Sequence, residues 1–233
     1  MVNFKRHILL PLLLATGLCA PSNLMADDQD FATDLSLGIK KDLTKRLDFS
    51  LGAGARLKNN SSELDRFSAE GGFSVAAIKK WVDLDAGYVF IADWNGPEDE
   101  YYSYRHRYNI GLDLYHKLGK RLTWDVRCKW QSTYRSEKMK TYKWDPKDYI
   151  RIRGGLDYKI KGLPLNAYAS AEAFCSTNNP DGNDLDNMRY NLGVKYHLNK
   201  KNTFDLGFQV DDEMHVSKPK DRFMLCVGYK FKL

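Results

Sequence analysis

The chain has 233 residues, of which 28% are charged and 43% hydrophobic, and it carries a formal net charge of +6. Its mean hydropathy of -0.54 is polar. After residue 26 no apolar stretch approaches the roughly 20 residues that a membrane-spanning helix needs, which excludes a helical membrane protein. The basic residues are spread over many segments, so no nucleic-acid partner is expected.

The N-terminus has the composition of a secretory signal peptide. Two basic residues precede the apolar run at 8–15, and small residues follow it, with Ala20 and Ala26 as alternative cleavage positions. The apolar run is too short to span a membrane as a helix. We therefore expect a signal peptide over 1–26, cleaved after Ala20 or Ala26, and a single exported domain over 27–233.

From residue 31 onward, apolar and polar residues alternate in one segment after another. Alternation with period two is typical of a strand that has one apolar face. Each segment has about 7 to 12 residues, near the length with which a tilted strand crosses a bilayer. In chain order the eleven segments lie at 31–39, 47–57, 67–77, 82–90, 108–114, 122–130, 150–160, 165–173, 190–198, 204–210 and 223–233.

The connections between these segments alternate in length. Short turns are expected at 40–45, 78–80, 117–121, 161–164 and 199–202, and longer polar loops at 58–65, 93–103, 133–147, 175–187 and 211–221. A meander with short turns at one end and long loops at the other is the outer-membrane pattern. The sequence therefore predicts an all-β fold, a transmembrane antiparallel up-and-down β-barrel of about 10 to 12 strands.

Charged residues occupy the phase opposite to the apolar one. Such a face cannot meet lipid, so we expect it to line the lumen, whereas a soluble barrel would turn its apolar phase inward. Acidic residues lie toward the short turns and basic residues toward the long loops, and aromatic residues gather at both strand ends as interfacial girdles. The predicted lumen charge network comprises Glu70, Asp83, Asp85, Arg105, Arg107, Asp113, Asp125, Arg127, Lys129, Arg151, Arg153, Asp157, Glu172, Arg189 and Asp205.

This network has two interpretations. In a narrow barrel the opposite charges pair into a structural polar core. Alternatively they line a passage whose arginine ring favours anions. Binding of envelope components through the loops is a third role. Under the structural interpretation, replacing Arg107 or Arg153 by leucine lowers stability because the lost partner leaves a buried charge behind.

A lipid-modifying hydrolase is the catalytic alternative, since such a site needs a nucleophile within reach of a base. On the apolar phase His106 lies between Tyr104 and Tyr108 with no serine beside it, which indicates a girdle residue. His215 and Ser217 resemble the His-x-Ser spacing of lipid A deacylating barrels, but they fall in a loop. We therefore expect no catalytic residues and no enzyme.

Neither a metal nor a cofactor is indicated. The acidic run at 181–186 has oxygen ligands at alternate positions. It lacks the glycine that a calcium loop has at its sixth position and the glutamate that it has at its twelfth. Cys128, Cys175 and Cys226 remain after removal of the signal peptide, an odd number without a Cys-x-x-Cys pair. We expect three free thiols, no metal site and no cofactor.

Six short motifs are spread over the exported chain. They are LSLGIKKDLTKRL at 35–47, YRHRY at 104–108, YIRIR at 149–153, AEAF at 171–174, MRY at 188–190 and VGYKF at 227–231. In this order they resemble a group of uncharacterised outer-membrane β-barrel proteins of unknown function. The resemblance implies a barrel and an outer-membrane location without an activity. The expected partners are outer-membrane lipid, lipopolysaccharide and the barrel assembly machinery, which would bind the C-terminal strand of a monomer.

Overall fold

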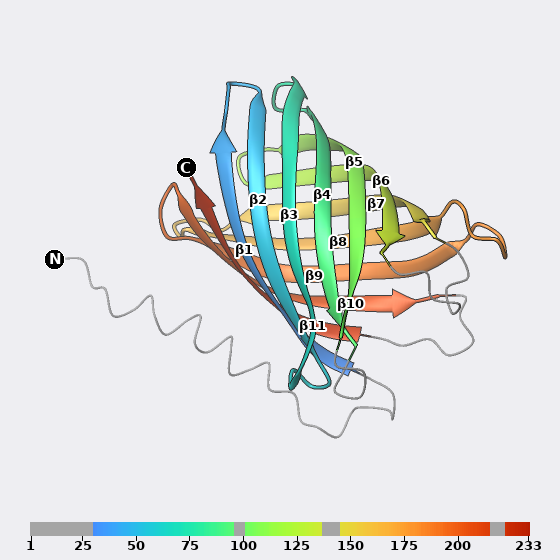
Figure 1. Cartoon of the computed structure of the whole chain (residues 1–233). Coiled ribbons are helices and arrows are strands. Elements are labelled where there is room, and N and C mark those ends of the chain that lie inside the picture. The colour runs from blue at the N-terminus through green and yellow to red at the C-terminus, as the bar shows by residue number, and fades with distance from the viewer. Residues whose placement is uncertain (1–29, 96–100, 137–144, 215–221) are drawn as a thin grey trace.

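The strands of this protein close into a single barrel (Figure 1). The computed structural model describes residues 30–95, 101–136, 145–214 and 222–233. The strands are β1 (Asp30–Asp42), β2 (Leu47–Lys58), β3 (Glu63–Ile78), β4 (Val82–Trp94), β5 (Tyr102–Leu118), β6 (Leu122–Arg135), β7 (Lys147–Lys159), β8 (Leu165–Ser176), β9 (Leu185–His197), β10 (Asn202–Glu213) and β11 (Arg222–Lys232). The predicted all-β barrel of about 10 to 12 strands is confirmed. The predicted signal peptide lies outside the described residues.

Several strands are longer than the alternating segments that predicted them. β3 has 16 residues and β5 has 17. The ladder between β4 and β5 continues to the pair Trp94 and Tyr102, well beyond the predicted start of that segment at residue 108. Backbone pairing needs no apolar side chain, so apolar alternation marks only part of each strand.

The closing pair of strands is parallel. β1 pairs with β11 in parallel from Asp30 opposite Arg222 to Lys40 opposite Lys232, and the other ten neighbouring pairs are antiparallel. Figure 1 shows the arrowheads of β1 and β11 at the same end. The predicted antiparallel sheet is therefore wrong for this pair. In a meander of eleven strands the first and the last point the same way, so closure makes them parallel.

The connection between β2 and β3 is a tight turn, where a long loop was expected at 58–65. It spans 59–62, and Asn59, Asn60 and Ser61 all have positive φ. The Ser62 amide donates to the carbonyl oxygens of Lys58 and Asn59 at 3.1 and 3.2 Å. Asparagine tolerates this left-handed conformation better than most residues do. The longer connections at this end are therefore 95–101, 136–146, 177–184 and 214–221.

The apolar phase faces outward and the charged phase faces inward. On the outer wall Leu37, Ile110 and Leu192 are 63%, 60% and 66% exposed. Among the described residues the only buried apolar side chains are those of Ala32, Ile91 and Met224. A soluble barrel would bury its apolar phase, so this distribution is the reverse of that alternative. None of the described residues belongs to a helix long and apolar enough to cross a membrane.

Candidate functional site: the charged lumen

The lumen charges pair with one another along the wall. Apart from Arg66–Asp65 within β3 (2.9 Å), every ion pair among the described lumen residues joins strands that are neighbours or next but one. The pairs between strands are Arg56–Asp34 (2.5 Å), Arg66–Asp93 (3.5 Å), Arg105–Asp93, Arg127–Asp113 (2.5 Å), Lys129–Asp85 (3.1 Å), Arg151–Glu172 (2.8 Å), Arg153–Asp125 (2.6 Å), Arg189–Asp211 (2.6 Å), Lys195–Asp157 (3.1 Å) and, at the turn end, Lys40–Asp48 (2.7 Å). Only neighbouring strands approach within 8 Å between Cα atoms. The ion pairs of the described residues therefore follow the wall and do not bridge the lumen.

Several partners in this network were missing from the predicted set. Asp34, Asp93 and Asp211 each bind an arginine at the long-loop end of the barrel. The predicted sorting of acids toward the short turns is therefore incomplete. Asp93 continues the inward phase of Asp83 on β4, and Asp211 continues the inward phase of Asp205 on β10. Following the charged phase past the last apolar residue would have found both.

Toward the loop end, two arginines sandwich an inward aromatic ring. The Arg151 guanidinium donates to both carboxylate oxygens of Glu172 at 3.1 and 2.8 Å, and Arg189 donates to both of Asp211 at 2.6 and 3.1 Å. Their guanidinium carbons lie 4.4 and 4.9 Å from the centroid of Phe174. Bidentate pairing together with cation–π contact holds both side chains against the wall.

Toward the turn end, acidic residues outnumber their partners locally. Arg127 donates to both carboxylate oxygens of Asp113 at 2.5 and 2.8 Å, and Asp113 is 3% exposed. Asp83 lies directly opposite Asp113 in the ladder between β4 and β5. Arg127 therefore compensates a carboxylate that faces a second carboxylate.

Four members of the predicted network form no ion pair among the described residues. Glu70 packs over Gly52, where an added Cβ would lie 2.6 Å from Glu70 Oε1. Asp205 accepts a hydrogen bond from the Tyr168 hydroxyl at 2.8 Å. The other two are Asp83 and Arg107. Each remaining member of the predicted network forms an ion pair with another described residue.

Small residues form one sector of the inner wall. Most inward positions at the middle of β1 to β4 carry glycine or serine, and the large exception is Glu70, which packs over Gly52. The small inward residues are Ser36, Gly38, Ser50, Gly52, Gly54, Ser68, Gly72 and Gly87. In the strand order of the closed barrel, β1 to β3 lie across from β6 to β8, which carry Arg127, Lys129, Arg151 and Arg153. Long basic side chains therefore face a wall with little side-chain volume.

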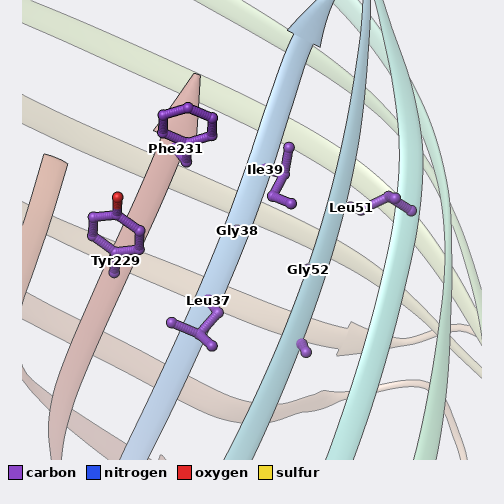
Figure 2. Close-up of a pocket in the computed structure, with 8 residues that line it drawn as sticks. Leu37, Gly38, Ile39, Leu51, Gly52, Tyr229 and Phe231 are labelled. Atoms are coloured by element: carbon purple, nitrogen blue, oxygen red, sulfur yellow. The ribbon is translucent and has the colours of Figure 1, made fainter. Parts of the chain in front are cut away.

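The outer wall carries an apolar groove at the parallel seam (Figure 2). Its side chains are Leu37, Ile39, Leu51, Ala53, Tyr229 and Phe231, from β1, β2 and β11. Gly38 and Gly52 form the floor. Apart from the Tyr229 hydroxyl, which donates to Asn202 Oδ1, the groove offers only hydrocarbon surface and holds no pair of groups for catalysis.

A serine does lie beside His106, contrary to expectation. Ser136 Oγ is 3.1 Å from His106 Nε2, and the Tyr88 hydroxyl is 2.7 Å from Nδ1. The serine was missed because it comes from the end of β6, where Ser136 N–H donates to Tyr104 O at 2.9 Å. His215 and Ser217, the other candidate pair, lie outside the described residues.

Metal-binding residues do not gather in the described part of the chain. There, no group of three or more His, Cys, Asp or Glu side chains could hold a metal ion. In the acidic run at 181–186, Asp184 O and the Asp186 carboxylate accept hydrogen bonds from Ser176. Cys128, Cys175 and Cys226 are free thiols.

Comparison with known proteins identifies a family without an assigned activity. A family profile described as "Protein of unknown function (DUF2490)" matches residues 35–215, from β1 to just beyond β10. A search of curated proteins finds no match to the chain.

Proposed function

Since the chain belongs to this DUF2490 family of unknown function, its role has to be argued from geometry. We propose that it is a β-barrel of the bacterial outer membrane whose lumen lets small solutes pass passively. Export through the signal peptide and assembly through β11 are parts of the same proposal.

The outer wall supports the membrane location. Large apolar side chains on the outward phase are exposed in the isolated chain, and contiguous apolar surface of this extent is unusual for a soluble monomer. Aromatic side chains lie at both ends of the strands, among them Tyr104 and Tyr108 toward the loops and Tyr158 and Phe204 toward the turns. Such rings suit the two interfaces of a bilayer.

The proposal of a passage is supported by the inner wall, where the ion pairs and the small residues occupy different parts. Ion pairs that cross a barrel would fill it, whereas these pairs stay within two strands of each other. Their side chains remain partly exposed, for example 27% for Arg127 and 34% for Lys195. Water therefore reaches the charged side chains from inside the barrel, and the glycine and serine sector leaves room beside them.

Conductance of the refolded chain in a planar bilayer tests the passage. The wild type is expected to give discrete current steps. Gly38→Phe places a ring in the small-residue sector and is expected to lower the unit conductance. An added Cβ there makes only ordinary van der Waals contacts, with Lys230 Cγ at 3.5 Å, Leu51 O at 3.9 Å and Tyr229 O at 4.0 Å. Leu37→Phe, on the outward phase next to it, is the matched control and should leave the unit conductance unchanged.

Two results would overturn the proposal. A correctly refolded wild type without current steps assigns the ion-pair network a purely structural role. Steps whose size is the same in Gly38→Phe and in the wild type place the conducting path elsewhere, for instance in aggregates of the protein.

A further inference from the structure

Arg107 is a cation of the lumen that has no carboxylate partner among the described residues. Its Nε donates to Thr133 Oγ1 at 3.3 Å, which is a long hydrogen bond. The register explains the missing acid. The cross-strand neighbours of Arg107 are Val89 on β4 and Thr133 on β6. By contrast, Arg127 and Arg189 each have an aspartate directly opposite.

The charges around Arg107 are also positive. The strongest act from Arg105, Arg151, Arg66 and Arg189. Arg66 pairs with Asp65 at 2.9 Å and shares Asp93 with Arg105, Arg151 pairs with Glu172, and Arg189 pairs with Asp211. Arg107 therefore adds a positive charge that forms no ion pair with an acid of the described residues. Placing a guanidinium away from bulk water without a counter-charge is costly unless an anion joins it.

The unused donors around Arg107 define the ligand chemistry. Among the described residues, neither Nη group of Arg107 has a hydrogen-bond partner, and the buried Nε of the neighbouring Arg105 has none either. Ile91, 2% exposed, lies opposite Arg105 in the ladder between β4 and β5 and offers it no acceptor. A guanidinium fork with spare N–H groups matches the paired oxygens of a carboxylate or a phosphate.

We propose that Arg107, with Arg105 beside it, forms a binding site for a small free oxyanion inside the loop-end half of the lumen. The site rests on the proposed open lumen, because the ligand has to reach Arg107 from water. Binding is weak and reversible, since a solute in a passage must also leave it. The same charge makes the passage prefer anions over cations.

Titration with inorganic phosphate tests the site. The full exported chain, refolded in detergent micelles, is titrated at constant ionic strength and followed by phosphorus NMR or calorimetry. The wild type should bind saturably, and Arg107→Gln should weaken binding at least tenfold. Arg121→Gln makes the same charge change at an exposed turn and should bind like the wild type. Circular dichroism and heat-dependent gel migration verify that each variant is folded.

Arg107→Lys provides a second variant that keeps the charge and loses the fork. It should bind phosphate more weakly than the wild type and more tightly than Arg107→Gln. The site is wrong if the folded wild type shows no saturable binding, or if Arg107→Gln and Arg121→Gln bind alike. Phosphate binding without conductance would retain the site and remove the passage, whereas conductance without phosphate binding would do the reverse.

Discussion

Replacing Arg127 by leucine removes the partner of Asp113, the least exposed carboxylate among the described residues. Asp113 is 3% exposed and accepts two hydrogen bonds from Arg127, at 2.5 and 2.8 Å. Asp83 lies directly across from Asp113 on β4. In Arg127→Leu these two carboxylates would face each other without the cation that compensates them, so we expect the barrel to lose stability.

The size of the loss follows from the burial of the two side chains. Removing one member of a fully buried ion pair costs about 3 to 5 kcal/mol. Here the Asp113 side chain is 4% exposed, but that of Arg127 is 27% exposed, so water partly replaces the lost guanidinium. We therefore expect the free energy of unfolding to fall by about 2 to 3 kcal/mol, below the full value for a buried pair.

Urea unfolding in phospholipid vesicles measures this change, and the fluorescence of the five tryptophans follows the unfolding. Arg121→Leu is the control, because Arg121 is exposed in the turn before β6. Its effect should stay within about 0.5 kcal/mol. The double variant Arg127→Leu/Asp113→Asn removes both charges and should recover most of the loss, since removing both members of a pair leaves no stranded charge.

The reasoning is refuted by either of two results. One is a urea midpoint of unfolding for Arg127→Leu that equals the midpoint for Arg121→Leu. The other is a double variant as unstable as Arg127→Leu alone, which would mean that the loss comes from packing and not from the stranded carboxylate.

Three further predictions concern other residues. Arg153→Leu should lower the thermal stability of the refolded barrel by stranding its aspartate, whereas Arg107→Leu should leave it unchanged or raise it, because no carboxylate is stranded; equal losses would contradict this. In vesicles Cys128, exposed on the outward phase, should react with a membrane-soluble maleimide and resist a charged one; the opposite order would turn this face toward water. A serine-directed phosphonate probe should leave Ser136 unlabelled, because the Ser136 N–H already donates to Tyr104 O, and the group at His106 Nδ1 is the Tyr88 hydroxyl and not a carboxylate. Labelling of Ser136 found by mass spectrometry would instead establish a nucleophile.

The different stability changes expected for Arg107→Leu and Arg153→Leu show what could not be predicted from the sequence. Both arginines lie on the charged phase, Arg107 in the loop-side half of β5 and Arg153 at the middle of β7, and both were expected to have buried acidic partners. Arg153 donates to Asp125 at 2.6 Å, while Arg107 meets a valine and a threonine across the ladders. The expected loss of stability in Arg107→Leu is therefore withdrawn, and the arginine becomes a candidate ligand site.

The sequence by itself determined the alternation of faces, the number of strands to within one, and most of the residues that line the lumen. These features are local, because residues two apart on a strand share a face whatever the neighbouring strand does. The same rule placed Cys128 outside and Arg127 inside before any pairing was known.

Only the tertiary structure decided which inward residues meet. Partners depend on the register between strands, and the register shifts at bulges such as those after Arg56 and Phe174. A single shift changes the neighbour of every later residue, and no pattern within one strand records it. The parallel seam between β1 and β11, the serine beside His106 and the isolation of Arg107 all follow from such long-range pairing.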